Sequence, residues 1–134
     1  MKTIFITGAT SGIGKATAIL LAKQKNRLIL CGRNKTILEE LKTELSKETE
    51  VFTLSFDVRN SDEVFSAINS LPENWKNIDV LINNAGNAHG LDPISEGNID
   101  DWNSMMDGNV KGLLYVSQPI IKLMKEKQNG QIIN

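Results

Sequence analysis

The sequence predicts an α/β fold in three layers, αβα, with a doubly wound parallel sheet of about five strands between two layers of helices. Short runs of β-branched and aliphatic residues alternate along the chain with segments of helical periodicity, and every run is too short to be a helix. This alternation is typical of βαβ units, whose crossovers are right-handed by default. The expected strands are residues 3–6, 27–31, 51–56, 79–82 and 131–133.

The first three helical segments differ in how their apolar residues are spaced. Residues 13–25 are apolar almost all round, as expected of a helix pressed against a sheet, whereas residues 37–45 carry a single apolar stripe. Asn60 stands three residues before Glu63, which predicts a capping box, and Pro72 is expected to end the helix that follows. The predicted inner face of that third helix is Val64, Ala67, Ile68 and Leu71.

A long fourth helix is expected to begin at Asn98, because Asp100 and Asp101 place carboxylates near the positive end of a helix dipole. Pro119 should kink this helix and Gly130 should stop it. We expect the two adjacent methionines to be helix core rather than a binding stripe. The predicted apolar face is Trp102, Met105, Met106, Val110, Leu113 and Leu114.

Composition restricts the class of protein. A chain of 134 residues with 40% hydrophobic residues suits one domain, residues 1–134, and a net charge of −1 argues against binding nucleic acid or an acidic membrane. No window approaches 18 apolar residues, and Met1 is not followed by a signal-like segment. Cys31 is the sole cysteine and is expected to be a small core side chain in a cytoplasmic, reducing setting. No residue cluster has metal-ligand spacing, so no metal site is expected.

The loop after the first expected strand carries three glycines, Gly8, Gly12 and Gly14, and runs directly into a helix. Gly8 would allow a sharp turn, Gly12 would remove a side chain where backbone approaches a pyrophosphate, and Gly14 would allow close packing. The helix would then direct its free N–H groups at the anion, with hydroxyls from Thr10 and Ser11 beside them. A plain connecting turn is the alternative, and the place between strand and helix favours the phosphate site.

Segments after two other strands point to the same pocket. Asn83 to Gly86, with sequence NNAG, offers small and amide side chains past which a flat ring could slide, and Asp57 offers a carboxylate to an exocyclic amine. His89 follows at the edge of the expected cleft, where a solvent-exposed loop residue is favoured over a substrate contact.

The end of the second strand predicts the choice of cofactor. A protein that binds NAD usually has an acidic residue at this position to bind the ribose hydroxyls, but residues 27–38 contain no Asp or Glu. Arg33 instead offers a guanidinium group that suits a 2′-phosphate, which predicts NADP. The alternative for Arg33 is a solvated surface arginine.

Four motifs resemble those of the short-chain dehydrogenases/reductases: TGATSGIG at 7–14, Asp57-Val58, NNAG at 83–86 and NVKG at 109–112. The segments SFDVRN and LPENWKNIDVLINNAG are similar to the NADP-dependent 3-hydroxy acid or serine dehydrogenase branch. The resemblance implies a Rossmann fold, a hydrogen bond between Asp57 and adenine, and Asn84 near the cofactor ribose. It implies cofactor contacts from Gly8, Ala9, Thr10, Ser11, Gly12, Ile13, Gly14, Val58, Ala85 and Gly86.

The resemblance also implies a catalytic Ser and a Tyr-x-x-x-Lys pair after the fifth strand, and the sequence ends at Asn134. Tyr115 is not a substitute, because no lysine follows four residues later. Of the family's catalytic set only Asn109 is present, where it would kink the helix and hold a water in a proton relay. Its alternative role is to cap an irregular helix.

These observations predict the N-terminal part of a short-chain dehydrogenase domain, with the C-terminal part absent and hydride transfer very poor, because acid–base help supplies ~10²- to 10⁴-fold. Such a piece should expose apolar surface on its sheet edge and fourth helix, and should therefore self-associate or have limited solubility. In the family that helix commonly contributes to a dimer or tetramer interface, so a homo-oligomer is the implied parent state.

Three classes of function remain open. The first is an NADP-dependent oxidoreductase acting on a small alcohol or carbonyl substrate, with a 3-hydroxy acid or serine implied by the resemblance. The second is a non-catalytic dinucleotide-binding or sensor module. The third is a flavodoxin- or receiver-like domain, but a receiver needs an acidic cluster after its first strand, and residues 7–9 supply none. Codons after Asn134 that encode a Ser and a Tyr-x-x-x-Lys would favour the enzyme.

Overall fold

The computed structural model describes residues 1–134 and contains one sheet of five parallel strands in the order β3-β2-β1-β4-β5. The predicted doubly wound α/β sheet is therefore confirmed. The chain winds outward in one direction through β2 and β3 and then returns to the other side of β1, so the order reverses between β1 and β4. The strands are β1 (Thr3–Ile6), β2 (Arg27–Gly32), β3 (Val51–Ser55), β4 (Val80–Ile82) and β5 (Gln131–Ile133).

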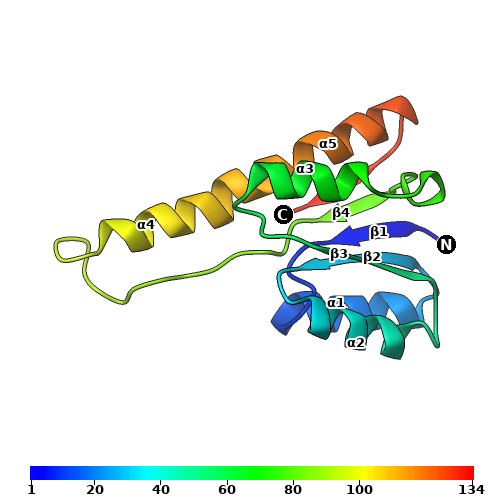
Figure 1. The fold of residues 1–134 in the computed structure, drawn as a ribbon, viewed down its shortest axis with the longest axis horizontal. Helices are drawn as coiled ribbons and strands as arrows, with labels where there is room; N and C mark the ends of the chain where they lie inside the picture. The colour runs from blue at the N-terminus through cyan, green and yellow to red at the C-terminus, as the bar shows by residue number, and fades with distance from the viewer.

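Helices cover both faces of the sheet (Figure 1). On one face lie α1 (Gly12–Lys23) and α2 (Lys35–Leu45), and on the other lie α3 (Ser61–Asn69) and α5 (Gly112–Glu126). The remaining helical segments are η1 (Glu73–Trp75), α4 (Ile99–Met106) and η2 (Asp107–Lys111).

The segment from the end of β4 through α4 extends away from the sheet as an arm (Figure 1). None of the residues of α4 is buried. Its π-helical continuation, η2, joins it to α5, which packs on the sheet and against α3. The arm therefore begins next to the carboxyl ends of the strands and has no protein layer over its outer surface.

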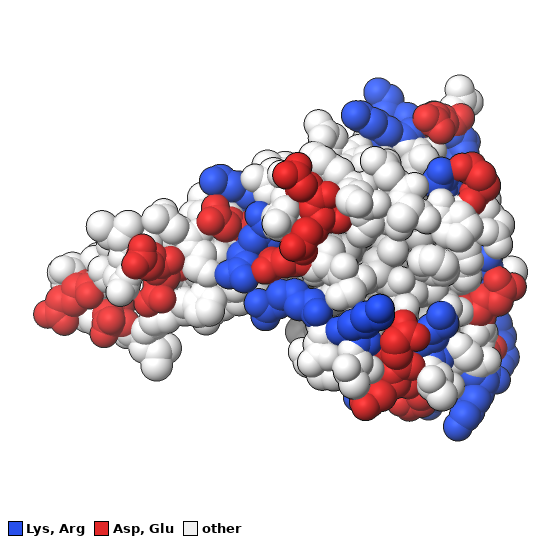
Figure 2. All heavy atoms as spheres, in the orientation of Figure 1, with Lys and Arg blue, Asp and Glu red and all other residues white.

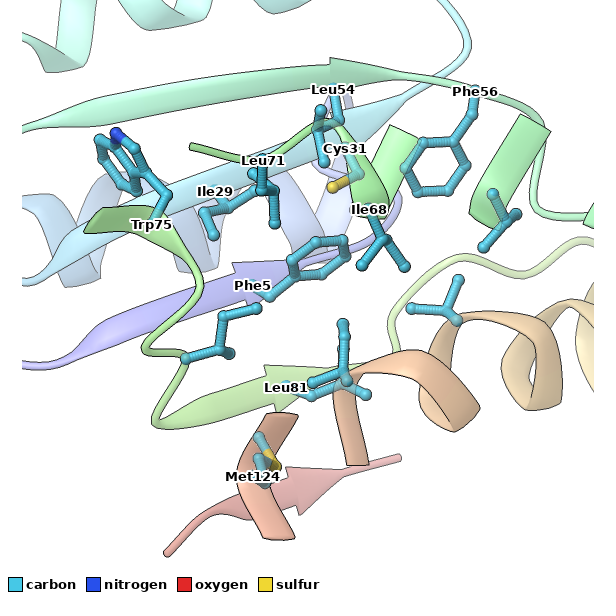
Figure 3. Close-up of a cluster of buried hydrophobic side chains, with 14 residues drawn as sticks. Phe5, Ile29, Cys31, Leu54, Phe56, Ile68, Leu71, Trp75, Leu81 and Met124 are labelled. Atoms are coloured by element: carbon cyan, nitrogen blue, oxygen red, sulfur yellow. The ribbon is translucent and has the colours of Figure 1, made fainter. Parts of the chain in front are cut away.

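Two apolar clusters lie on opposite faces of the sheet, because side chains alternate along each strand. Phe5 and Ile29 point into the cluster under α3 and α5 (Figure 3), whereas Ile4 and Leu28 point into the cluster under α1 and α2. Burial on both faces is what a parallel sheet requires.

The first helix differs from its predicted pattern. It does not bury apolar residues all round, since the side chains of Ile13 and Leu20 are 79% and 58% exposed. Its buried face is made of Gly14, Ala18 and Ala22, which recur every four residues. Small side chains on this face let the helix lie close to the sheet, and the larger residues flank the contact.

The predicted long fourth helix is also corrected. It is divided into α4, the π-helical η2 and α5, and Pro119 lies inside α5, which ends at Glu126. Met106 is 53% exposed, so the prediction that the methionine pair is core is wrong for this residue, because nothing covers the arm. The expected exposure of apolar residues on this helix and on the sheet edge is confirmed. The exposed residues are Trp102, Met106, Val110, Leu114, Ile121, Ile132 and Ile133.

No helix has both the length and the apolar character needed to cross a bilayer.

An ion pair lies at the amino ends of the strands. Lys127, just after α5, donates to Asp79 Oδ1 at 2.7 Å, while Asp79 Oδ2 accepts from the Thr3 amide at 2.8 Å. Burial alone would raise the pKa of Asp79, but these hydrogen bonds and the Lys127 charge outweigh it and lower that pKa. The pair joins the starts of β1 and β4 to the end of α5.

Replacing Lys127 by Met should lower the free energy of unfolding by about 1 kcal/mol at pH 7, because a partly buried charged hydrogen bond is lost. The lowered Asp79 pKa means that this contribution is present above the unfolded pKa, about 3.9, and is lost as pH falls through the folded pKa. Urea denaturation of both proteins across this range measures the difference. Lys25→Met, which removes an exposed pair with Glu48, is the control and should leave the midpoint unchanged.

Candidate functional site

A cavity of about 470 Å³ lies at the carboxyl ends of β1 to β4, where strand order reverses. Ligands of doubly wound sheets bind at this point. Basic and acidic side chains lie next to one another where the arm leaves the body, and acidic side chains gather toward the tip of the arm (Figure 2). The lining residues are Thr7, Gly8, Thr10, Ser11, Gly12, Ile13, Cys31, Gly32, Arg33, Phe56, Asp57, Val58, Arg59, Asn84, Ala85, Gly86, Asn87 and Gly108.

The three glycines of the turn serve two different purposes. Gly8 has φ +62°, and a Cβ there would lie 2.8 Å from Asn84 Nδ2, while a Cβ on Gly14 would lie 2.2 Å from the Gly8 carbonyl oxygen. The packing of the protein itself therefore requires glycine at positions 8 and 14. Gly12 has φ +53°, and a Cβ there would meet nothing within 4 Å. The bare position at Gly12 therefore faces open space that a ligand can fill.

Thr7 and Asn84 hold this turn in place from two neighbouring strands. The Thr7 hydroxyl accepts from the backbone N–H groups of Asn84 and Ala85 at 3.0 and 2.9 Å. In return, Asn84 Nδ2 donates to the carbonyls of Thr7 and Gly8 at 3.2 and 3.0 Å. Asn84 thus supports the glycine turn as well as lining the cavity. Thr7 was not among the predicted site residues, because its only signal in the sequence is a hydroxyl at the end of a buried strand.

The amino end of α1 is left open toward the cavity. Its N-cap residue, Ser11, makes no side-chain cap, and the N–H groups of Gly12, Ile13 and Gly14 have no acceptor within the protein. By contrast, Asn34, Asn60 and Asn98 cap α2, α3 and α4. Free N–H groups at a helix start favour an anion. This opening, with the open space at Gly12, fits the phosphates of a dinucleotide.

Arg33 follows β2 at the rim of the same cavity and forms no ion pair. The residue before it, Gly32, lies against Thr10, because a Cβ there would come 2.7 Å from Thr10 Cγ2. A side chain at position 32 would require the Thr10 side chain to move. The end of β2 therefore presents a guanidinium group and no carboxylate.

Asp57 faces the cavity but is engaged by Arg59, a residue that the sequence analysis missed. Arg59 Nη2 lies 2.7 Å from Asp57 Oδ2, and the Asp57 amide donates to Glu63 at 3.0 Å. As predicted, Asn60 Oδ1 accepts a hydrogen bond from the backbone N–H of Glu63. The Glu63 carboxylate, however, accepts from the backbone N–H of Asp57 and not from that of Asn60, so the capping box is incomplete. The hydrogen bond and charge of Arg59 hold the pKa of Asp57 below its usual value, with a smaller effect from Arg33.

Asn109 lies in η2 and is bonded to the chain that leaves β4. Its Oδ1 accepts from the Asn87 amide at 2.8 Å, and its Nδ2 donates to the Asn87 carbonyl at 2.7 Å. Asn109 therefore fixes the start of the arm, and Asn87 rather than Asn109 lines the cavity. The π-helical segment that contains Asn109 lies where the resemblance implied an irregular helix.

Two further predicted cofactor residues lie behind the lining. Ala9 is fully buried and donates from its amide to the Cys31 carbonyl, while Gly14 packs under the turn. His89 is exposed in the arm and does not line the cavity. All other predicted cofactor residues line one cavity.

The chain resembles known proteins and solved structures along almost its whole length. It is 39% identical over 98% of its length to an NADP-dependent 3-hydroxy acid dehydrogenase of Escherichia coli O6:H1, and 43% identical over 99% to one of Schizosaccharomyces pombe. A solved structure described as the closed form of serine dehydrogenase complexed with NADP+ superposes with a TM-score of 0.91, at 39% identity over 98% of this chain and 52% of that one. The chain spans about half, 52%, of the length of the curated relatives it matches.

The parallel sheet, its switch point and the glycine turn define a Rossmann-like α/β protein. The sequence profile of the short chain dehydrogenase family matches residues 2–134, and the chain belongs to that family.

Replacing Thr7 by Val should lower the free energy of unfolding by about 1–3 kcal/mol, because two backbone N–H groups lose their acceptor at unchanged side-chain volume. Chemical denaturation measures this loss. Thr7→Ser keeps the hydroxyl and should retain most of the stability. An equal loss in both variants would show that the methyl group, not the hydroxyl, is what matters.

Proposed function

We propose that the chain binds NADP(H) and forms the cofactor-binding half of an NADP-dependent short-chain dehydrogenase. The observation that carries this proposal is the open amino end of α1, where three N–H groups without acceptors adjoin the empty space at Gly12. Donors fixed in this way suit the linked phosphates of a dinucleotide. The proposed contacts are Gly8, Thr10, Ser11, Gly12 and Ile13 from the turn, with Ala9 and Gly14 supporting it.

The other end of the cavity supports NADP over NAD. Arg33 is unpaired and β2 ends without a carboxylate, which suits a 2′-phosphate and leaves the two ribose hydroxyls of NAD without their usual acceptor. Relatives described as NADP-dependent support the same choice. Val58, Ala85 and Gly86 would line the rest of the cofactor site.

We propose that a protein of the relatives' length transfers a hydride between NADP(H) and a small alcohol or carbonyl substrate, such as a 3-hydroxy acid or serine. The bound cofactor would supply the hydride. Asn109 would hold the start of the arm, and through it the substrate side of the cleft, in position by its two bonds to Asn87. Tyr115 packs edge-on against Phe65 between α3 and α5, so it is not proposed as a proton donor.

The second candidate is a dinucleotide-binding module without catalysis, which would use the same cavity and glycine turn and would need no catalytic residues. Titration of the chain with NADPH, followed by cofactor fluorescence, tests the binding that both candidates share. Saturable binding supports the proposal, and no binding refutes both. Assay of a 3-hydroxy acid and serine with NADP+, using a chain extended by its downstream codons, then separates the two candidates.

Replacing Arg33 by Ala should weaken NADP+ binding by ~1.5–3 kcal/mol, because a charged hydrogen bond to the 2′-phosphate is lost. NAD+ affinity should be unchanged. Isothermal titration with both dinucleotides measures the two effects. Equal NADP+ affinity in the variant and the original chain would exclude Arg33 as the phosphate ligand.

We also propose that the chain forms a homo-oligomer through the outer face of α4 and α5. Trp102, Met106, Val110 and Leu114 recur at intervals of four residues and are exposed across both helices. A monomer seldom leaves such a continuous apolar strip in water.

Replacing Leu114 by Glu should lower the mass of the oligomer in solution, because a charge would then be buried in the apolar contact. Light scattering after size exclusion measures this mass. Leu20→Glu is a matched control, since Leu20 on α1 is also 58% exposed but lies outside the strip. A mass that changes equally in both variants would exclude this surface.

A further inference from the structure

The side-chain amide of Asn87 is unpaired at the wall of the cavity. Asn87 lines the cavity, and its Oδ1 is buried without a hydrogen-bond partner. The hydrogen bonds that Asn87 does make use only its backbone N–H and carbonyl, both of which are bonded to the Asn109 side chain at 2.8 and 2.7 Å. The amide nitrogen, Nδ2, also has no acceptor within the protein. Because an unsatisfied buried polar atom lowers stability, such a side chain calls for a use outside the fold.

The two asparagines beside Asn87 differ from it in this respect. Asn84 lines the same cavity, but its Nδ2 donates to the carbonyls of Thr7 and Gly8. The Asn109 amide is used on both sides, since its Oδ1 and Nδ2 bond the backbone of Asn87. Asn87 therefore has its backbone fixed while its amide is free to bind a ligand.

Two glycines place this amide beside the segment that follows β3. A Cβ on Gly108 would lie 3.6 Å from both Nδ2 and Oδ1 of Asn87. A Cβ on Gly112 would lie 2.9 Å from Val58 Cγ2. Residues four apart in a helix lie one above the other on the same face. Asn87 and Val58 therefore adjoin one face of the helix formed by η2 and α5, and both line the cavity.

This position belongs to the adenosine end of the proposed dinucleotide site. Arg33, after β2, is the proposed contact for the 2′-phosphate, which the adenosine ribose carries. Val58 follows β3, the next strand outward from β2, and Asn87 adjoins Val58. Adenine nitrogens accept hydrogen bonds, and an asparagine amide is the usual side-chain partner of adenine where proteins read bases. A free Nδ2 donor at this place therefore suits adenosine.

We infer that Asn87 is a binding residue for the adenosine half of NADP(H), with Nδ2 as a hydrogen-bond donor to it. This inference rests on the proposed function, because it names a contact within the same site. Asn109 then holds the backbone that carries the contact, and Gly108 adds no side chain that would cover the amide.

Isothermal titration tests this inference with NADP+ and with adenosine 2′,5′-bisphosphate, which carries the adenosine half and no nicotinamide. Asn87→Leu keeps the approximate shape and removes the amide, and it should weaken both ligands by the same factor, about 3- to 10-fold. Asn87→Asp has the same shape without donor hydrogens and should weaken both at least as much. His89→Ala is the control, because His89 is exposed and lies outside the cavity, and it should change neither affinity.

Urea denaturation separates ligand binding from a structural role of the amide. Because Asn87 Oδ1 has no partner, an apolar group of similar shape should leave the unfolding midpoint unchanged or raise it. Asn87→Leu is therefore expected to bind the ligands more weakly without being less stable. A lowered midpoint would show that the amide stabilises the fold, and would overturn the inference.

Three binding results would overturn the inference while the proposed function stands. The first is unchanged NADP+ affinity in both Asn87 variants. The second is weaker NADP+ binding with unchanged affinity for the bisphosphate, which would move the contact to the nicotinamide half. The third is a loss in Asn87→Leu with full affinity in Asn87→Asp, which would make the amide an acceptor. If the original chain binds neither ligand, the proposed function and this inference both fail. Circular dichroism checks folding, and Asn87→Asp decides the matter if Asn87→Leu is unfolded.

Discussion

The hydrogen bonds between Thr7 and the segment at Asn84 are the constraint on which the site depends. They join residues 77 positions apart in the sequence, across the β1–β4 contact where strand order reverses. Thr7 fixes the chain after β4, and the Asn84 amide fixes the turn after β1. A register shift of one residue would turn Thr7 to the other face of the sheet. Strand register therefore determines whether the open helix end faces a cavity at all.

The close packing of α1 follows from the same constraint. A Cβ on Gly14 would collide with the carbonyl that Asn84 binds, so the turn, the helix and Asn84 form one rigid contact. The buried face of the helix must then be small throughout, as Ala18 and Ala22 are. Because packing against the sheet holds α1 in place, its first turn does not need a side-chain cap. Three of its N–H groups therefore have no acceptor within the protein. The missing cap leaves these N–H groups facing the cavity.

The sequence predicted the features that are encoded locally. Strand alternation, the Asn60 and Asn98 caps of α3 and α4 and the glycine turn each depend on residues a few positions apart, and all are present. The face of α1 was predicted wrongly because hydrophobic periodicity gives weight to large side chains, whereas the distance between helix and sheet selects small ones. Hydrophobic periodicity did not reveal that α4 is exposed, because a helix has the same apolar stripe in its sequence whether or not other residues cover that stripe. Thr7 was missed because its partner lies on a distant strand.

Arg59 illustrates a different limit on what a motif can tell. The pair Asp57-Val58 identifies a carboxylate at the end of β3, and the sequence alone makes that carboxylate an available acceptor. Whether it is available depends on its lone pairs, and in this fold the turn into α3 brings the guanidinium group of a residue two positions later onto both oxygens. The turn is itself fixed by the Glu63 carboxylate on the Asp57 amide. The motif therefore locates the Asp57 carboxylate, whereas its ion pair with Arg59 depends on how the chain turns into α3.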